Sequence, residues 1–391
     1  MQAILMVLDS VGIGAAPDAD VYGDAGANTL ANLADAVGGV SVPTLARMGL
    51  GNIPGVLPSG RAIRGVSAAD FPAASFGALR EMSKGKDTTT GHWEMAGLLL
   101  ERGFHLFPHR QPCFPAELTD ALEPRTRRAV IGNKHASGTV IIEELGHEHM
   151  RDGSWIAYTS ADSVFQVAAH EEIIPLEELY RGCEVARELC NELFVGRVIA
   201  RPFVGEPGSF RRTQNRRDYS YPLPEPTILD RLSEAGHRVT TVGKLDDVFD
   251  HRGMTDALHV ENNADAQRAT LDVAREDREG LVFVNLIDFD MLYGHRRDAR
   301  GYASALEKTD AFLDELVGLM MSGDVLIVTA DHGNDPTFSG TDHTREYVPL
   351  LVYRPGRTGA NLGIRNGFYD IAQSLAALFK IDPMPRGRSF L

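Results

Sequence analysis

The chain contains three mainly apolar runs, each of which leads directly into acidic residues, and Asn285 and Thr329 are the polar positions within them. A mainly apolar run of this length is typical of a strand that is buried on both faces, as in a parallel sheet. The sequence therefore predicts three buried strands that end in carboxylates. The runs cover residues 3–8, 281–287 and 325–330, and the acids that follow them are Asp9, Asp288 with Asp290, and Asp331.

A helical pattern lies between the last two runs, where Leu306, Leu313, Val317 and Met320 fall on one face. Strand, helix and strand then alternate, which predicts the α/β class with a mainly parallel sheet covered by helices. Folds of this kind bind ligands at the carboxyl ends of their strands. The acidic residues are therefore expected at a functional edge of the sheet.

The middle of the chain has its own alternation of strands and helices and is interpreted as a second, smaller α/β domain. Its strands are expected at residues 155–159 and 198–203, and its helices at 138–150 and 176–193. The proline-rich segment 221–226 suits a stiff hinge at its exit, because proline interrupts both helices and central strands.

Composition excludes several classes of protein. The 391 residues carry 39 Lys and Arg against 54 Asp and Glu, a net charge of −15. This charge argues against general binding to nucleic acid or to anionic membranes. The longest apolar runs are too short for a membrane span or a secretory signal, and the three cysteines show no CxxC spacing. We therefore expect a cytoplasmic protein that binds neither nucleic acid nor membrane.

Histidines join the acidic residues at the predicted strand ends. His295 follows Asp290 by five positions, His332 follows Asp331 directly, and His343 comes eleven positions later. Together with Asp9, these residues provide three carboxylates and three imidazoles, enough for two metal ions. The mixed donor set suits Mn²⁺ or Zn²⁺, because Mg²⁺ prefers oxygen ligands and retained waters.

Three consecutive hydroxyls, on Thr88, Thr89 and Thr90, precede a helix expected to begin near Thr89. A hydroxyl at this place is often a plain helix cap. Beside bound cations it also has what a nucleophile toward phosphate requires, since metal coordination lowers its pKa and backbone N–H groups face the anion. Spacing alone does not distinguish the three threonines.

These motifs together resemble the phosphopentomutase family of the alkaline phosphatase superfamily, and the resemblance extends over nearly the whole chain. The matching segments are residues 7–14, 85–88 with 90–94, 158–163, 197–203, 288–290 with 294–298, 329–335 and 341–346.

The resemblance implies roles for individual residues. Thr88 would be the phosphoacceptor, Ser160 and Asp162 would contact the sugar, and Arg197 and Lys244 would bind the phosphate that is not transferred. The implied metal sites are one formed by Asp9, Asp331, His332 and Thr88, and one formed by Asp290, His295 and His343, with two Mn²⁺ as the usual ions and Zn²⁺ or another divalent ion as alternatives.

The same resemblance implies the domain organisation and the reaction. An alkaline-phosphatase-like core would comprise residues 1–101 and 222–391, with residues 102–221 inserted as a cap. The enzyme would be an isomerase that interconverts (deoxy)ribose 1-phosphate and 5-phosphate through phosphothreonine and a 1,5-bisphosphate, with a sugar bisphosphate as primer. A metal-dependent phosphatase or a phosphoglycerate mutase of the same superfamily is the alternative.

Overall fold

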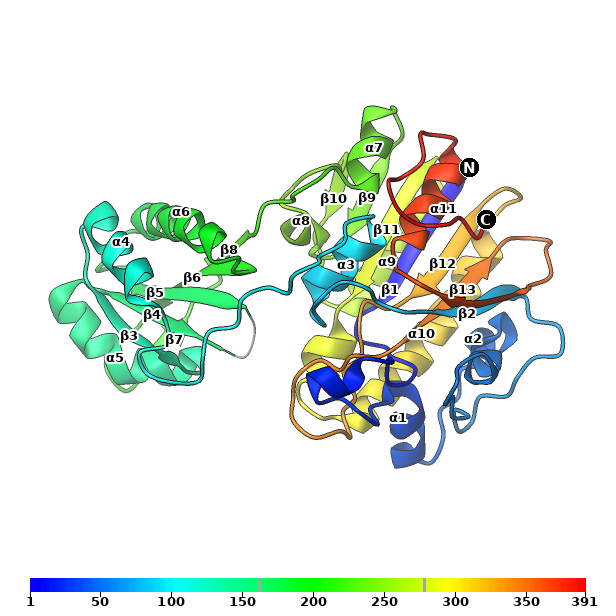
Figure 1. Cartoon of the computed structure of the whole chain (residues 1–391), viewed down its shortest axis with the longest axis horizontal. Helices are drawn as coiled ribbons and strands as arrows, with labels where there is room; N and C mark the ends of the chain where they lie inside the picture. Colours follow the sequence, from blue (N-terminus) through cyan, green and yellow to red (C-terminus); the bar gives the residue numbers. More distant parts are fainter. Residues whose placement is uncertain (161–162, 277–278) are drawn as a thin grey trace. The chain divides into compact units, whose positions relative to one another are not determined.

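The computed structural model describes residues 1–160, 163–276 and 279–391. The described chain forms two compact units, of which the first combines Met1–Arg102 with Pro224–Leu391 and the second is Gly103–Leu223 (Figure 1).

An eight-stranded, mainly parallel sheet forms the centre of the first unit. Only β13 runs antiparallel to both of its neighbours, β12 and β2. The strands in spatial order are β10 (Asp256–Leu258), β9 (Val239–Val242), β11 (Gly280–Leu286), β1 (Gln2–Leu8), β12 (Val325–Thr329), β13 (Val348–Tyr353), β2 (Ala74–Leu79) and β14 (Asn361–Arg365).

The three strands predicted from the apolar runs are confirmed, and they are adjacent. β1 lies between β11 and β12 and is parallel to both, with Val7 paired to Asn285 on one side and to Thr329 on the other. Every residue of the three strands is buried. This register brings the carboxyl ends of the strands, and the residues that follow them, to one edge of the sheet.

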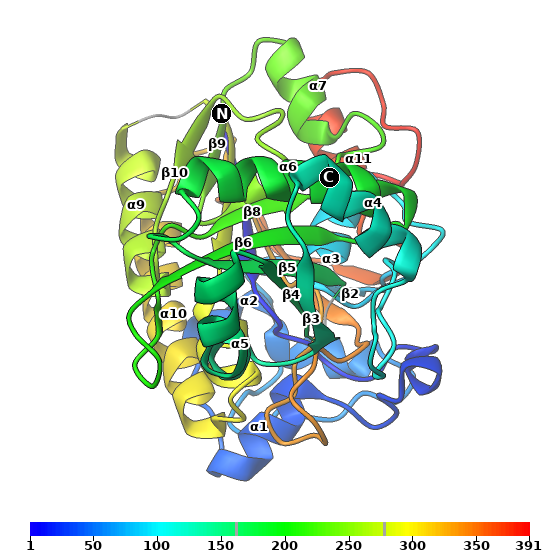
Figure 2. The same cartoon turned by 90° about the vertical axis from the view of Figure 1, so that its left-hand side faces the viewer.

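Helices cover both faces of this sheet. Figures 1 and 2 show α9 and α10 on one side and α3, α7 and α11 on the other, and α10 also contacts α1 and α2. The helices of the unit are α1 (Thr29–Val37), α2 (Pro43–Met48), α3 (Thr88–Met95), α7 (Ile228–Glu234), α8 (Leu245–Val248), α9 (Asn263–Glu276), α10 (Ala299–Leu319) and α11 (Asp370–Phe379), with 3₁₀ turns at Ala19–Tyr22 and Leu50–Gly55 and a π-helix at Phe289–Gly294.

The predicted apolar face of α10 is only partly right. Leu306 and Leu313 are buried, whereas Val317 is partly exposed. Met320 was placed on the same face, but the helix ends at Leu319 and Met320 has extended backbone. The loss of helical geometry at its C-terminus removes Met320 from the predicted stripe.

The second unit is a smaller α/β sandwich. Its sheet has a core on each face, one packed against α4 and α6 and the other against α5, and Figure 2 shows the two helical groups on opposite sides. The α/β fold class is thus confirmed in both units. The elements are α4 (Ala116–Thr126), α5 (Gly138–Asp152), α6 (Leu176–Glu192), and β3 (Val130–His135), β4 (Trp155–Thr159), β5 (Val164–His170), β6 (Arg197–Val204), β7 (Arg211–Arg212) and β8 (Arg217–Ser220).

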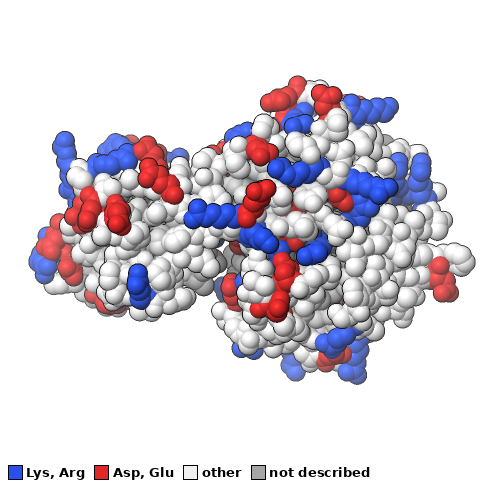
Figure 3. Space-filling model, viewed as in Figure 1, with Lys and Arg blue, Asp and Glu red and all other residues white. Residues whose placement is uncertain are grey.

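Acidic and basic side chains are interspersed on the face drawn in Figure 3. The excess of acidic residues is therefore not gathered into one continuous patch on that face. None of the helices in the described ranges has both the length and the apolar composition that crossing a bilayer requires.

Candidate metal centre

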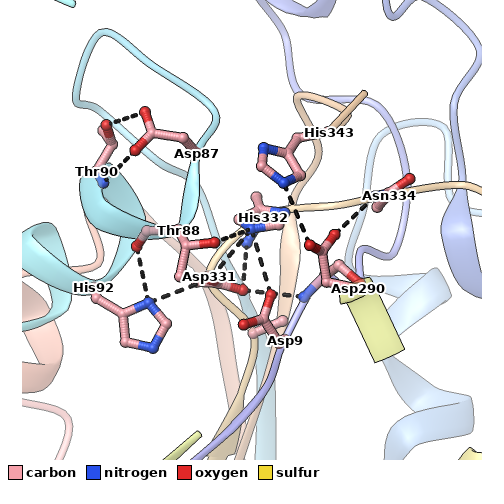
Figure 4. Close-up of polar contacts among 12 residues, drawn as sticks. Asp9, Asp87, Thr88, Thr90, His92, Asp290, Asp331, His332, Asn334 and His343 are labelled. Atoms are coloured by element: carbon pink, nitrogen blue, oxygen red, sulfur yellow. Dashed lines mark hydrogen bonds and ion pairs between the residues drawn. The ribbon is translucent and has the colours of Figure 1, made fainter. Parts of the chain in front are cut away.

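Three carboxylates lie close together at the carboxyl ends of the adjacent strands β1, β11 and β12. Asp9 follows β1, Asp331 follows β12 by one residue, and Asp290 lies in the π-helix after β11. All three carboxylates are buried. The sequence-predicted acids therefore meet because parallel neighbours end at the same edge, and Figure 4 shows them facing a common space.

The first group of potential ligands consists of Asp9, Asp331 and His332, whose donor atoms all lie within 4.8 Å of one another. His332 Nε2 is 3.2 Å from Asp331 Oδ2 and 3.5 Å from Asp9 Oδ1. The Thr88 hydroxyl oxygen lies 3.2 Å from the same nitrogen (Figure 4). These four residues are the set that the resemblance implied for one metal.

The second group is centred on Asp290. Its Oδ2 lies 2.9 Å from His295 Nε2 and 3.5 Å from His343 Nε2. The three donor atoms that lie within 4.8 Å of one another belong to Asp290, His343 and His332, so His332 stands between the two groups. His295 reaches Asp290 from outside this triplet.

Backbone carbonyls orient two of the imidazoles. His332 Nδ1 donates to the Gly333 carbonyl oxygen at 3.0 Å, and His295 Nδ1 donates to the Thr341 carbonyl oxygen at 2.6 Å. Because a carbonyl oxygen only accepts, Nδ1 of each ring carries a proton, and in the neutral ring Nε2 carries none. The Nε2 lone pairs are therefore directed toward the carboxylates, as metal ligation requires.

The polar atoms of the centre fit divalent cations. Asp9 Oδ1, Asp331 Oδ2 and His343 Nε2 are buried and have no hydrogen-bond partner within the described ranges. A buried acceptor without a donor costs of the order of 1–3 kcal/mol, and more when it is charged. A cation among these atoms offsets that cost, so the arrangement is that of a metal centre.

The charges of the centre are strongly coupled. Burial, together with the carboxylates of Asp331 and Asp290, raises the pKa of Asp9 well above its usual value. Burial acts in the same direction on Asp331, but His332 and His92 hold the pKa of that carboxyl below its usual range. The three buried carboxylates are therefore stable in their ionised form only when positive charge lies beside them.

The three threonines of α3 have different environments. Asp87 caps the helix by accepting from Thr90 N at 3.1 Å, and it also accepts from the Thr90 hydroxyl at 2.6 Å (Figure 4). The alternative that a threonine caps this helix is therefore wrong, because the preceding aspartate takes that role. Thr89 is buried, whereas Thr88 is partly exposed and faces His332.

Comparison with known proteins agrees with this chemistry. Residues 1–383 match the Metalloenzyme superfamily. A phosphopentomutase of Clostridium novyi is 50% identical, with 100% of this chain and 98% of that protein aligned. One from Desulfitobacterium hafniense is 52% identical over the same shares of the two chains. The chain belongs to the phosphopentomutase family.

Solved structures with a similar course of the chain include the PH0037 protein of Pyrococcus horikoshii, with a TM-score of 0.47, 14% identity and 97% of each chain covered. A phosphoglycerate mutase of Leishmania mexicana gives a TM-score of 0.47 at 11% identity, covering 99% of this chain and 96% of that one.

Several residues that support the centre of this phosphopentomutase-family protein were not predicted from the sequence. His92 Nδ1 lies 2.8 Å from the Thr88 carbonyl oxygen and 3.2 Å from Asp331 Oδ2. Asn285 donates to Asp9 Oδ2 at 2.8 Å, and Asn334 donates to Asp290 Oδ1 at 2.7 Å. Among these contacts, only that between His92 and Thr88 has a signal in the sequence, because His92 lies one helical turn after Thr88.

Arg345 is a further residue that the sequence analysis missed. Its buried guanidinium pairs with Glu81, donates to the Gly85 carbonyl oxygen at 2.7 Å and reaches Asp18 at 3.1 Å. These contacts fix the segment that leads into α3. Arg345 therefore positions the residues before Thr88 without touching the carboxylates of the centre.

The predicted substrate residues are divided between the two units. Arg197 begins β6 in the second unit, 3.8 Å from Asp218, and Ser160 Oγ accepts from Gln166 at 3.4 Å. Lys244 is exposed at the start of α8 in the first unit. Asp162 lies outside the described residues, and the substrate roles of all four remain predictions.

Proposed function

We propose that this chain catalyses the interconversion of pentose 1-phosphates and 5-phosphates, with Thr88 as the residue that carries the phosphoryl group. Family membership supports the isomerase activity, and ribose and 2-deoxyribose phosphates are the proposed substrates. The observation that carries the assignment to Thr88 is its partly exposed hydroxyl, 3.2 Å from His332 in the metal centre.

The reaction divides into two transfers. In the first, the Thr88 Oγ–P bond breaks and a bond forms between phosphorus and the free hydroxyl oxygen of the sugar phosphate, which loses its proton. The product is a 1,5-bisphosphate. In the second, Thr88 Oγ attacks the other phosphorus, the sugar oxygen leaves and takes up a proton, and phosphothreonine is regenerated.

The chain contributes several features to these steps. Thr88 occupies the first turn of α3, where backbone N–H groups and the helix dipole favour an anion. The ligand sets proposed for two Mn²⁺ ions are Asp9, Asp331, His332 and Thr88 for one, and Asp290, His295 and His343 for the other. Such cations stabilise the attacking and leaving oxygens of a transferred phosphoryl group.

Ser160, Asp162, Arg197 and Lys244 are proposed to bind the sugar and the phosphate that stays in place. A guanidinium matches a phosphate in a two-pronged hydrogen bond, which suits Arg197 to this role. Replacing Arg197 or Lys244 with alanine is expected to raise the KM for ribose 5-phosphate. Phosphorylation of Thr88 by a bisphosphate at saturating concentration would remain.

The deciding experiment locates the phosphate by mass spectrometry after the Mn²⁺-loaded protein has reacted with a sugar 1,5- or 1,6-bisphosphate primer. We expect phosphate on Thr88 in the wild type and none on T88A. The matched variant Thr89→Ala should retain phosphorylation. Phosphate on Thr89 or Thr90 in the wild type would reassign the acceptor.

A product assay separates the mutase from its superfamily relatives. With ribose 5-phosphate, the protein should form ribose 1-phosphate faster than inorganic phosphate. Faster release of inorganic phosphate would instead indicate a phosphatase, and preference for phosphoglycerate would indicate the other mutase.

A further inference from the structure

A second group of aspartates and histidines lies at the same carboxyl edge of the first unit's sheet, beyond the central strands. β9 and β10 are parallel neighbours at the end of the sheet. Asp246 and Asp247 lie in α8, which follows β9, and His259 follows β10 directly. His251 lies between them. These four residues are called the edge cluster below, and Figure 1 shows α8 beside β9 and β10.

The contacts of the edge cluster converge on one carboxylate oxygen. Asp246 Oδ2 lies 3.5 Å from His251 Nδ1 and 3.4 Å from His259 Nε2. These separations exceed a hydrogen bond. Each is close to the distance of about 3.3 Å between two ligands of a tetrahedral zinc ion with bonds of about 2.0–2.1 Å. The donor atoms that all lie within 4.8 Å of one another are those of Asp246, Asp247 and His251, and His259 reaches Asp246 from outside this triplet.

A second feature of Asp246 also indicates a missing positive partner. The residue is only 3% exposed, and its Oδ1 is buried without a hydrogen-bond partner in the described part of the chain. A buried carboxylate that accepts so few hydrogen bonds is unfavourable unless a cation lies beside it. Asp247 Oδ1 lies 3.9 Å from the other ring nitrogen of His251, which is beyond a hydrogen bond but on the side where an outer carboxylate accepts from a metal-binding imidazole.

The metal centre provides an internal reference for this geometry. There, His332 Nε2 lies 3.5 Å from Asp9 Oδ1, and Asp9 Oδ1 is likewise buried without a partner within the described ranges. The edge cluster has a similar carboxylate-to-imidazole spacing, and Asp246 also has a buried oxygen without a partner in the described ranges, but this oxygen is Oδ1 whereas the imidazoles face Oδ2. The two groups therefore share the features by which the centre fits a cation.

We infer that the edge cluster binds one further divalent cation, a zinc-like ion held by Asp246, His251 and His259. Two imidazoles and one carboxylate are the donors that Zn²⁺ accepts readily, with a fourth position left for water. The two rings are largely exposed, so the ion would reach the site from solvent. It would join the segment after β9, which includes Lys244, to the segment after β10.

The test counts metal ions in the intact protein. Mn²⁺-loaded chain is equilibrated with micromolar Zn²⁺, and total zinc plus manganese per chain is measured by plasma mass spectrometry. The wild type should hold one ion more than the double variant His251→Ala, His259→Ala. His147→Ala, an exposed histidine of α5, is the control and should match the wild type.

Equal ion counts in the wild type and the double variant would overturn the inference. Since both replaced rings are mostly exposed, the double variant should keep its fold, which far-ultraviolet circular dichroism checks. As a second measurement, Asp246→Asn should weaken binding of the extra Zn²⁺ at least tenfold, because it removes the central negative charge. Unchanged affinity in that variant would also contradict the site. Neither result depends on the activity of Thr88.

Discussion

The metal centre and the edge cluster are built from the same residue types at the same edge of one sheet, but they differ in enclosure. The side chains of His332 and His343 are 1% and 7% exposed, whereas those of His251 and His259 are 68% and 67% exposed. The centre follows β11, β1 and β12 in the interior of the sheet, whereas the cluster follows the edge strand β10 and its neighbour β9. The difference lies in the imidazoles, since Asp246 is as buried as Asp9, and His295 of the centre, at 35% exposed, is intermediate.

The two regions also differ in the residues that surround the ligands. Around the centre, Asn285, Asn334 and two backbone carbonyls hold individual carboxylates and imidazoles in place. At the edge, Asp247 faces His251 from 3.9 Å. Such outer contacts fix the ligand orientation, so the centre is held in one arrangement while the exposed rings of the cluster have more freedom.

The largest expected effect comes from removing a carboxylate of the centre. Asp331→Ala should lower both the metal content and the rate of mutase turnover, the latter by about 10³-fold or more, because cations stabilise the transferring phosphoryl group by several kcal/mol. Metal analysis and steady-state kinetics check this. Full activity in the variant would show that Asp331 is not a required metal ligand. The functional difference between the metal centre and the edge cluster would then be unsupported.

The next effect is the pH dependence of stability that the buried carboxyl group of Glu346 produces. Glu346 accepts from Gly14 N, from both Thr29 N and its hydroxyl, and from the Thr344 hydroxyl, yet burial raises its pKa to about 7. Below the usual pKa of 4.5 the side chain is protonated in the folded and unfolded states alike. Between about 4.5 and about 7, only the unfolded chain ionises, so stability falls as pH rises.

The Glu346→Gln variant isolates this contribution, since an amide does not ionise. Relative to this variant, the wild type should lose of the order of 3 kcal/mol of unfolding free energy between pH 4.5 and pH 7. Urea unfolding of both proteins at saturating Mn²⁺ measures the difference. If the unfolding free energies of the two proteins differ by the same amount at every pH in this range, Glu346 ionises with its usual pKa.

A smaller effect is expected from the outer contacts of the centre. Asn334→Ala removes the donor to Asp290 Oδ1 and should weaken metal affinity by about 10–100-fold while leaving the fold intact. Titration with Mn²⁺, followed by activity, gives the affinity. Unchanged Mn²⁺ affinity would mean that this outer hydrogen bond does not contribute to metal binding, and the contrast with the edge cluster would not hold.

The smallest effect is expected at the edge. Without added Zn²⁺, His259→Ala should change the unfolding free energy by less than about 0.5 kcal/mol, because exposed side chains contribute little to stability. The matched variant His343→Ala, at a buried position, should be clearly destabilising or lose metal. Equal effects of the two substitutions would contradict the difference in enclosure.

The sequence alone determined the strands, their acidic ends and the fold class. Mainly apolar runs have few alternatives to burial between neighbouring strands, so β1, β11 and β12 were predictable, and with them the common edge for Asp9, Asp290 and Asp331. The histidines were found because they follow these acids closely along the chain.

Spacing in the sequence did not separate Thr88 from its two neighbours, and Thr88 was expected from the family resemblance alone. Only the tertiary structure showed the Thr88 hydroxyl beside His332 and placed His92, Asn334 and Arg345 around the centre. Such polar residues sit in loops or on a short helix, where no periodicity marks a functional side chain. The edge cluster required the structure for the same reason. His259 meets Asp246 only because β9 and β10 pair in parallel, a contact between segments that local sequence does not encode.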